Sequence, residues 1–268
     1  MAGDALRELR DLTAVLRVEC PWDREQTART IVPHTVEEAY EVAEAALADD
    51  PAKLRDELGD LLFQVFFLSR LLEEQDEGDL DEVARGVHEK LVRRHPHVFG
   101  AAEAATPGHV RARWETIKTE QEGREGVFHD VPQSLPALLR ARKVQRRAAA
   151  VGYDWPDLDG PAGKVREEVE ELLAEVARTG RPPAETEPDR RVEAELGDLL
   201  FTVVNLARFV NVDPELALRA TTQRFVARVE LAERLAAEAG ETWTELDLDA
   251  QERWYERAKA AFGPAEHP

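Results

Sequence analysis

One nine-residue segment occurs twice in this chain, and this repetition limits the possible folds more than any other feature does. Glu57-Leu-Gly-Asp-Leu-Leu-Phe-Gln-Val65 returns as Glu195-Leu-Gly-Asp-Leu-Leu-Phe-Thr-Val203, so that only the eighth position differs. Repetition at a distance indicates a duplicated structural unit. The copies lie too far apart for a solenoid repeat, and a chain of 268 residues has room for two domains. The sequence therefore predicts two modules of one kind.

Charged residues follow the same order around both copies. An acidic cluster comes first, then a basic residue, then the repeated segment, and last a basic pair with a spacing of four. In the first copy these residues are Glu37, Glu38 and Glu41, then Lys53, then Lys90 and Arg94; in the second they are Glu167, Glu168 and Glu171, then Arg191, then Arg224 and Arg228. Duplication alone explains the repeated apolar residues, but it explains less well why the acids repeat.

Helical periodicity covers most of the sequence and predicts an all-α protein. In the first module we expect helices near 4–18, 35–48, 51–74, 80–94 and 107–122. In the second we expect them near 134–149, 162–178, 188–210, 213–238 and 244–262. The predicted domains are residues 1–125 and 135–268, and a Gly- and Pro-containing linker at 126–134 joins them.

Composition excludes several classes of function. A formal net charge of −20 repels the phosphates of nucleic acid, and a small anionic substrate would need a metal ion and local basic residues to offset it. The single cysteine, Cys20, forms no intrachain disulfide, and no signal peptide is apparent. The most apolar stretch, 58–72, is too short and too polar to span a membrane. We expect a cytoplasmic protein without membrane or nucleic-acid partners.

The acids recur at a spacing of three, which places both members of a pair on one face of a helix. Glu38 and Glu41 form one such pair, and Glu57 and Asp60 form another. If the two helices pack antiparallel, the four carboxylates converge, and they repel one another unless a cation lies between them. The second module would bring together its own set of Glu168, Glu171, Glu195 and Asp198.

The surroundings of the acids favour a metal site over a solvated helix face, which is the usual explanation of a single Glu-x-x-Glu. Asp60 and Asp198 lie inside apolar runs. Gly59 and Gly197 each lower helix stability by about 1 kcal/mol relative to Ala, which indicates close approach by a neighbouring helix or a ligand. None of the seven histidines follows a Glu by three residues, and no Cys/His set suits zinc. Ligation by oxygen alone favours Mg²⁺, with Mn²⁺ possible, and phosphate chemistry.

The basic residues could hold a polyphosphate against such metals. Arg makes bidentate contacts to phosphate oxygens, and either Lys53, Lys90 and Arg94 or Arg191, Arg224 and Arg228 could serve. A solvated face with ion pairs four residues apart explains each basic group equally well when it is taken alone.

Taken together, these motifs resemble those of the MazG nucleoside triphosphate pyrophosphohydrolases of the tandem-domain type. The signature is Glu-Glu-x-x-Glu followed by Glu-x-x-Asp, and the resemblance covers nearly the whole chain. Further segments that carry it are Cys20-Pro-Trp-Asp-x-x-Gln-Thr27, Arg93-Arg-His-Pro-His-Val-Phe99, Trp114-x-x-x-Lys118, Val151-Gly-Tyr-Asp-Trp155 and Val204-Asn-Leu-Ala-Arg208.

The resemblance implies an all-α homodimer whose helices form four-helix bundles around each active site. It implies Mg²⁺-dependent hydrolysis of nucleoside triphosphates to the monophosphate and pyrophosphate, with broad specificity and a role in clearing aberrant or excess nucleotides. Carried over, the metal ligands and catalytic residues are Glu168, Glu171, Glu195 and Asp198. The nucleotide contacts are Lys164, Glu167, Arg191, Arg224 and Arg228, with Trp254 and Lys259 near the C-terminus.

The chain departs from the family pattern at three places. Ala194 stands where a third acid is frequent, and Arg191 stands where Lys is common. Trp254 lies five residues before Lys259, whereas Tyr255 lies four before it, so the aromatic role is open between these two.

The mechanistic hypothesis is in-line attack by water, with Glu168 or Glu171 as the base and with Arg224 and Arg228 stabilising the departing pyrophosphate. Two alternatives remain: a helical protein that binds nucleotide and metal for regulation or interaction without turnover, and a structural bundle with solvated acids. We expect the second module to be the main catalyst, because the first has His34 where the second has Lys164. The first module could also be a scaffold, a second enzyme or a regulatory site.

Overall fold

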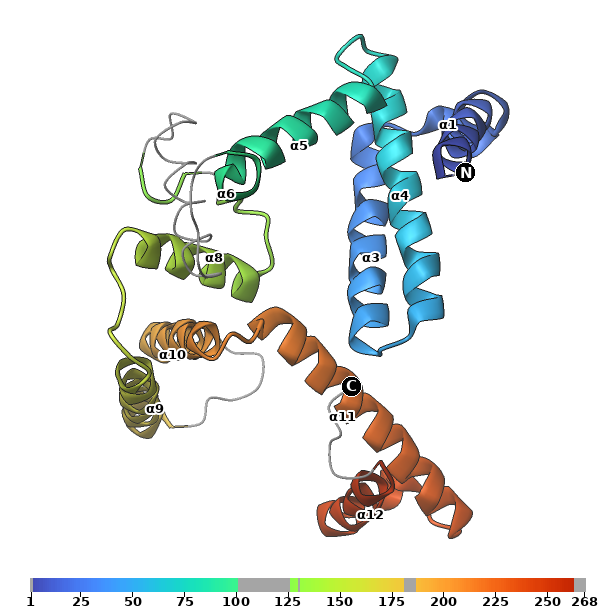
Figure 1. The fold of residues 1–268 in the computed structure, drawn as a ribbon. Coiled ribbons are helices and arrows are strands. Elements are labelled where there is room, and N and C mark those ends of the chain that lie inside the picture. Colours follow the sequence, from blue (N-terminus) through green and yellow to red (C-terminus); the bar gives the residue numbers. More distant parts are fainter. Residues whose placement is uncertain (1, 101–125, 130, 181–186, 263–268) are drawn as a thin grey trace. The chain divides into compact units, whose positions relative to one another are not determined.

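The computed structural model describes residues 2–100, 126–129, 131–180 and 187–262 (Figure 1). Their regular structure is helical and they include no strand, so the predicted all-α class is confirmed. They form two compact units, one within residues 2–100 and one within 126–262. The exact domain limits of 1–125 and 135–268 stay a prediction.

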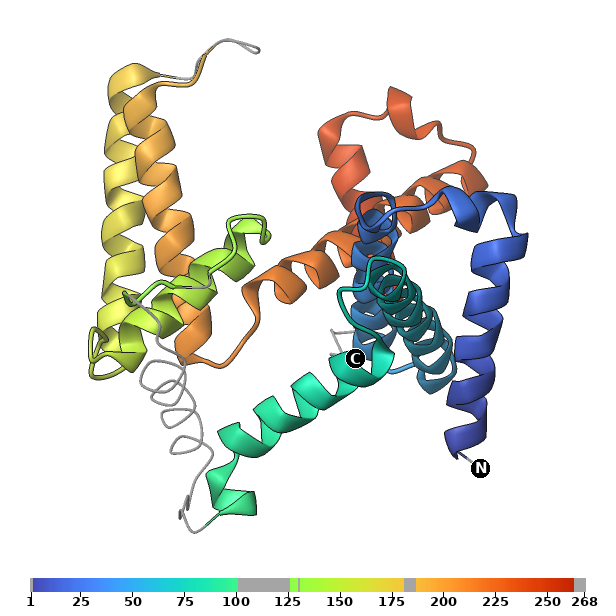
Figure 2. The same ribbon diagram turned by 90° about the horizontal axis from the view of Figure 1, so that it is seen from above.

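The first unit is organised around a hairpin of two long helices. Its elements are α1 (Ala2–Glu19), α2 (Pro21–Glu25), α3 (Ala28–Leu47), α4 (Pro51–Glu73), α5 (Leu80–Arg94) and α6 (Pro96–Phe99). Helices α3 and α4 lie side by side, and α1 packs against α4 (Figures 1 and 2). Asp50 begins α4, since its side chain accepts hydrogen bonds from the N–H groups of Ala52 and Lys53, both at 3.0 Å. The tight connection between the two helices therefore follows from local sequence.

A small apolar core joins α3 to α4. Ile31, Phe67 and Leu71 are buried together, and the Phe63 and Phe67 rings meet edge to face at 5.9 Å between centroids. Arg17 of α1 fastens the outer layer: it donates to both carboxylate oxygens of Glu74 at 3.0–3.1 Å and to the carbonyl of Gln26 at 3.0 Å. The guanidinium also bonds the carbonyl of Asp23, so one side chain connects three segments.

The second unit contains a matching hairpin. Its elements are α8 (Ala137–Ala150), α9 (Asp159–Thr179), α10 (Arg190–Phe209), α11 (Pro214–Glu238), the 3₁₀ turn η1 (Trp243–Glu245) and α12 (Leu248–Ala261). Helices α9 and α10 lie side by side, α8 packs on α10, and α12 packs on α11 (Figure 2). Gln145 of α8 donates to the carbonyl of Phe201 at 2.7 Å, which ties α8 to the hairpin.

The expected start of one helix is wrong, and so is one of the two reasons offered for the glycines of the repeated segment, the close approach of a neighbouring helix. Helix α3 begins at Ala28 and not near residue 35, because Thr27 and Thr30 form a capping box and the helix continues through Pro33. A Cβ added to Gly59 or Gly197 would meet nothing within 4 Å among the described residues, so no neighbouring helix of the chain approaches there. The predicted helix at 107–122, and with it the Trp114-x-x-x-Lys118 motif, lies outside the described residues.

Among the described residues, no helix is long and apolar enough to cross a membrane.

Candidate functional site

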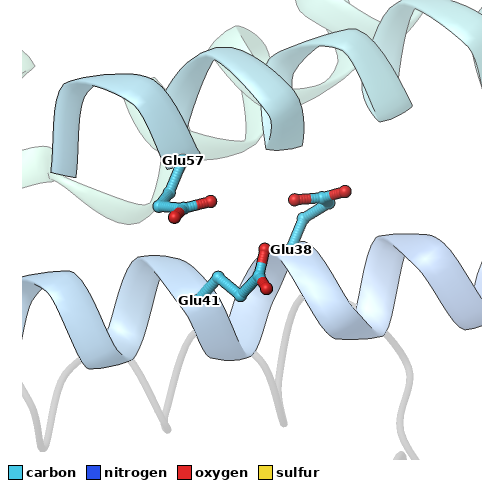
Figure 3. Close-up of side chains that lie close together, drawn as sticks. All are labelled: Glu38, Glu41 and Glu57. Carbon is cyan, nitrogen blue, oxygen red and sulfur yellow. The ribbon is translucent and has the colours of Figure 1, made fainter. Parts of the chain in front are cut away.

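The first hairpin brings three carboxylates together. Glu38 and Glu41 project from α3 and Glu57 from α4, and each offers one oxygen within 4.8 Å of the others (Figure 3). The fourth predicted member, Asp60, is exposed and lies outside this group. We name Glu38, Glu41 and Glu57 the first cluster.

The second hairpin brings together a different three of its four predicted acids. Glu168 of α9 meets Glu195 and Asp198 of α10 within the same 4.8 Å limit. Glu171 is exposed and does not join them at this distance. We name Glu168, Glu195 and Asp198 the second cluster. Glu168 is the most enclosed of the acids at 5% exposure, so its charge must be balanced by a neighbour.

Crowding of negative charge alters the acidity of both clusters. Burial raises the pKa of Glu38, and the nearby Asp60 and Glu41 raise it further. Burial likewise raises the pKa of Glu57, with Glu41 adding to it, and that of Glu195, with Glu171 and Glu168 adding to it. The two acids outside the clusters, Asp60 and Glu171, therefore still act on them electrostatically.

These donor sets fit a hard divalent cation. All ligand atoms are carboxylate oxygens, the type that Mg²⁺, Mn²⁺ and Ca²⁺ prefer. Mg²⁺ binds oxygen at about 2.1 Å, so two ligands on opposite sides of one ion lie roughly 4 Å apart. Oxygens within 4.8 Å of one another thus need only small side-chain movements to close on such an ion.

The clusters differ in the cation beside them. Lys164 Nζ lies 2.8 Å from Glu167 Oε1 and 2.8 Å from Glu168 Oε1, and these two hydrogen bonds raise the pKa of the lysine. At the equivalent place before the first cluster stands His34, whose Nδ1 is 3.7 Å from Glu37 and which contacts the edge of Trp22. Within the described residues, Glu38, Glu41 and Glu57 form no ion pair.

Most of the predicted phosphate contacts lie apart from the clusters. Lys53 is 3.9 Å from Glu44 and close enough to Glu57 to lower its pKa somewhat, against the raising effects. Arg224 donates to Thr221 at 2.9 Å, and Arg228 has a buried Nε without a hydrogen-bond partner. Within the described residues neither arginine forms an ion pair with the second cluster. Lys90 and Arg191 are exposed, and Arg94 is half-buried.

The aromatic candidates on α12 already have partners. Trp254 donates its indole N–H to Glu241 at 2.7 Å, and the Arg257 guanidinium lies 4.3 Å above its ring. Tyr255 contacts Phe225 of α11, with 5.9 Å between ring centroids. Lys259 pairs with Glu256 at 2.9 Å. None of these contacts joins α12 to the second cluster, so the choice between Trp254 and Tyr255 stays open.

Sequence inspection missed the ion pair between Lys164 and Glu168, although a signal was present. The two residues are four apart on α9, the spacing at which helical side chains meet. The Trp22–His34 ring contact had no comparable signal, because it joins α2 to α3 and depends on the turn between them.

Two helical hairpins, each gathering carboxylates from both of its helices, define an all-α class of protein suited to hold divalent cations between facing helices. The MazG nucleotide pyrophosphohydrolase domain matches the chain twice, at residues 26–99 and 162–231, and each match contains one hairpin. The chain belongs to the MazG family, so the resemblance drawn from its motifs is confirmed. The enzymes of this family are hydrolases that generally use divalent metal ions.

Relatives named nucleoside triphosphate pyrophosphohydrolase match between about half and nearly all of the chain. A nucleoside triphosphate pyrophosphohydrolase of Escherichia coli (strain K12) is 42% identical over 243 residues, 90% of either protein. A protein of Thermotoga maritima named nucleoside triphosphate pyrophosphohydrolase/pyrophosphatase MazG is 38% identical over 262 residues, 96% of this chain and 97% of the relative. A nucleoside triphosphate pyrophosphohydrolase of Mycobacterium tuberculosis is 36% identical over 152 residues, 56% of this chain and 46% of the relative.

Proposed function

We propose that this chain hydrolyses nucleoside triphosphates to the monophosphate and pyrophosphate with Mg²⁺, acts on a broad range of bases, and removes aberrant or excess nucleotides. Membership of the MazG family and the activities named for the relatives support the reaction. The observation that carries the proposal is the meeting of Glu168, Glu195 and Asp198 between α9 and α10. Mn²⁺ would serve in place of Mg²⁺, since both prefer oxygen ligands.

In this proposal the carboxylates hold the cation and one of them handles the proton. The metal ligands are Glu168, Glu171, Glu195 and Asp198 in the second module, and Glu38, Glu41, Glu57 and Asp60 in the first. A bound divalent ion supplies charge neutralisation of the triphosphate and a more acidic water. Glu171 suits the role of general base, because its charge raises the pKa of Glu195 in the cluster while its own side chain remains exposed to water.

The cations would bind the nucleotide. Lys164 and Glu167 would contact it, and their ion pair beside the second cluster supports this role. The proposed set continues with Arg191, Arg224, Arg228, Trp254 and Lys259, and in the first module with Lys53, Lys90 and Arg94. Because Arg224 and Arg228 form no ion pair with the acids in the described chain, their role requires the nucleotide or a second chain to bring them near.

We further propose a homodimer in which hairpins combine into four-helix bundles. Apolar residues at spacings of four and three form a stripe on α9 and another on α10, and all remain between 37% and 60% exposed: Val169, Leu173 and Val176, and Leu196, Leu200 and Val203. Such stripes are covered when a second hairpin packs on the first. Replacing Leu196 and Leu200 with Glu should convert a dimer to a monomer in light scattering; a parent chain that is monomeric refutes the assembly.

The reaction is tested by its products. Purified chain incubated with Mg²⁺ and a mixture of common and damaged nucleoside triphosphates should release pyrophosphate and monophosphates. Release of phosphate and diphosphates would contradict the proposed bond cleavage. Binding of nucleotide without any release would instead support the alternative of a regulatory protein without turnover.

A further inference from the structure

We propose that Lys164 shields the second cluster from free divalent cations and leaves it when a nucleoside triphosphate binds, so that metal and nucleotide enter this site together. The first cluster, which has no such lysine, takes up a cation alone. This inference rests on the proposed function, because it concerns the same carboxylates and the same substrate.

The position of Lys164 carries the argument. Its ammonium lies 2.8 Å from Glu168 Oε1, and Glu168 is a member of the second cluster with 5% exposure. A dication bound by Glu168, Glu195 and Asp198 would therefore sit a few ångströms from a positive charge. In a partly buried site, repulsion at such a distance is poorly screened by water. Cation binding must either overcome this repulsion or move the lysine away.

A triphosphate removes this obstacle. Its oxygens offer the ammonium several acceptors of stronger charge than one carboxylate, and the Lys164 side chain is 35% exposed, so it can turn outward to meet them. Once Lys164 binds phosphate, the carboxylates of the second cluster regain their full attraction for a dication. Nucleotide and metal then strengthen each other's binding, and the coupling is reciprocal.

The first cluster lacks this device. His34 occupies the corresponding turn, and its contact is with Glu37, which is not a member of the cluster. The carboxylates of Glu38, Glu41 and Glu57 have no ion-pair partner among the residues that the structure describes. The Lys53 ammonium lies near Glu57, but its ion pair is with Glu44 at 3.9 Å and not with a member of the cluster. A free cation therefore has easier access to these oxygens than to those of the second cluster.

The test measures metal binding in the absence of turnover. In full-length chain carrying Glu38→Gln and Glu57→Gln, only the second cluster binds Mn²⁺, and electron paramagnetic resonance follows the free ion without nucleotide. Lys164→Met should tighten Mn²⁺ binding about tenfold, the scale of one charge-assisted hydrogen bond. Lys164→Gln should act likewise, while Lys164→Arg should keep the parent affinity.

Arg178→Met is the matched control. It removes the same charge from the same helix, where Arg178 pairs with Glu175 and Asp189. It lies about 15 Å along the helix from Glu168, beyond the screening length of about 10 Å, so Mn²⁺ affinity should not change. Equal Mn²⁺ affinity in the parent, Lys164→Met and Lys164→Gln variants would overturn the proposal.

A second arm examines the coupling. The factor by which Mn²⁺ tightens binding of an α,β-methylene triphosphate should be smaller in Lys164→Met than in its parent; an unchanged factor refutes the coupling.

The reverse experiment introduces a lysine beside the first cluster. In chain carrying Glu195→Gln and Asp198→Asn, His34→Lys should weaken Mn²⁺ binding to the first cluster, and an unchanged affinity counts against the lysine effect. Absence of any Mn²⁺ binding, with or without the analogue, would instead defeat the proposed metal site itself.

Discussion

The first cluster consists of Glu38, Glu41 and Glu57, whereas the second consists of Glu168, Glu195 and Asp198, although both hairpins carry the same four acids in order. The first cluster uses both acids of α3 and one of α4, and the second uses one of α9 and both of α10. Near-identity of sequence therefore did not produce identical sites. The packing of each helix pair, and not the order of the acids alone, decides which carboxylates meet.

The cation beside each cluster differs as well. Lys164 neutralises part of the second cluster, while His34 leaves the first without an ion pair among the described residues. We infer a division of labour in which the second module carries most turnover and the first holds a cation more readily.

The largest effect should come from removing carboxylates in one module at a time. Glu195→Gln with Asp198→Asn should lower pyrophosphate release by about 10³-fold or more, because the cation loses two of its ligands. The corresponding pair Glu57→Gln with Asp60→Asn should leave most of the turnover. The measurement is kcat from pyrophosphate release at saturating Mg²⁺, with circular dichroism to verify folding. If the two double variants exchange these results, the first module is the main catalyst.

An intermediate effect concerns the arginines that fasten each module. Arg17→Met should destabilise the first unit by about 2–3 kcal/mol, since it removes one of the two guanidinium partners of Glu74, one of the two donors to the carbonyl of Asp23, and the donor to the carbonyl of Gln26. Arg208→Met should destabilise the second by about 1–2 kcal/mol, because it loses side-chain partners only, Asp154 and Asn205.

Hydrogen exchange of each unit in urea would measure both changes. Arg10→Met is the control, because its pair with Asp11 is 3.6 Å long and exposed, and its loss should change little. If Arg208→Met lowered the free energy of unfolding more than Arg17→Met, the hydrogen bonds from Arg17 to backbone carbonyls would not have the effect that we assign to them.

The smallest effect should be a dependence of stability on pH in metal-free protein. The pKa of Glu38 and that of Glu195 are raised in the folded state, so folding favours their neutral forms. The contribution of these two groups to the free energy of unfolding is fully present below their ordinary pKa of 4.5 and is lost as the pH rises through the raised pKa of the folded state. Glu38→Gln and Glu195→Gln should therefore raise the melting temperature slightly at pH 7 and not at pH 4.

Metal reverses the sign of this effect. With Mn²⁺ present at pH 7, the parent should melt higher than either Gln variant, because the cation binds the native carboxylates and stabilises the folded state. Gln variants that melt lower than the parent in a chelating buffer as well would show that the acids are not repelling one another.

Much of the fold could be predicted from local sequence. Asp50 and Asp213 precede Pro51 and Pro214, and each aspartate does cap the helix that follows. The start of α3 was predicted wrongly, because Pro33 suggests a helix boundary. The Thr27–Thr30 capping box begins the helix earlier and outweighs the loss of one backbone donor at the proline.

The sequence alone was enough to predict the all-α class. It also contained the acids and bases of the two hairpins and their spacing of three and four residues. These properties depend on helical periodicity, which is local. Tertiary packing was needed to establish that Glu41 but not Glu171 joins its cluster, that Asp198 but not Asp60 does, and that Trp254 of α12 donates to Glu241. Such choices depend on the relative rotation and depth of two packed helices, which side chains from distant parts of the chain set together.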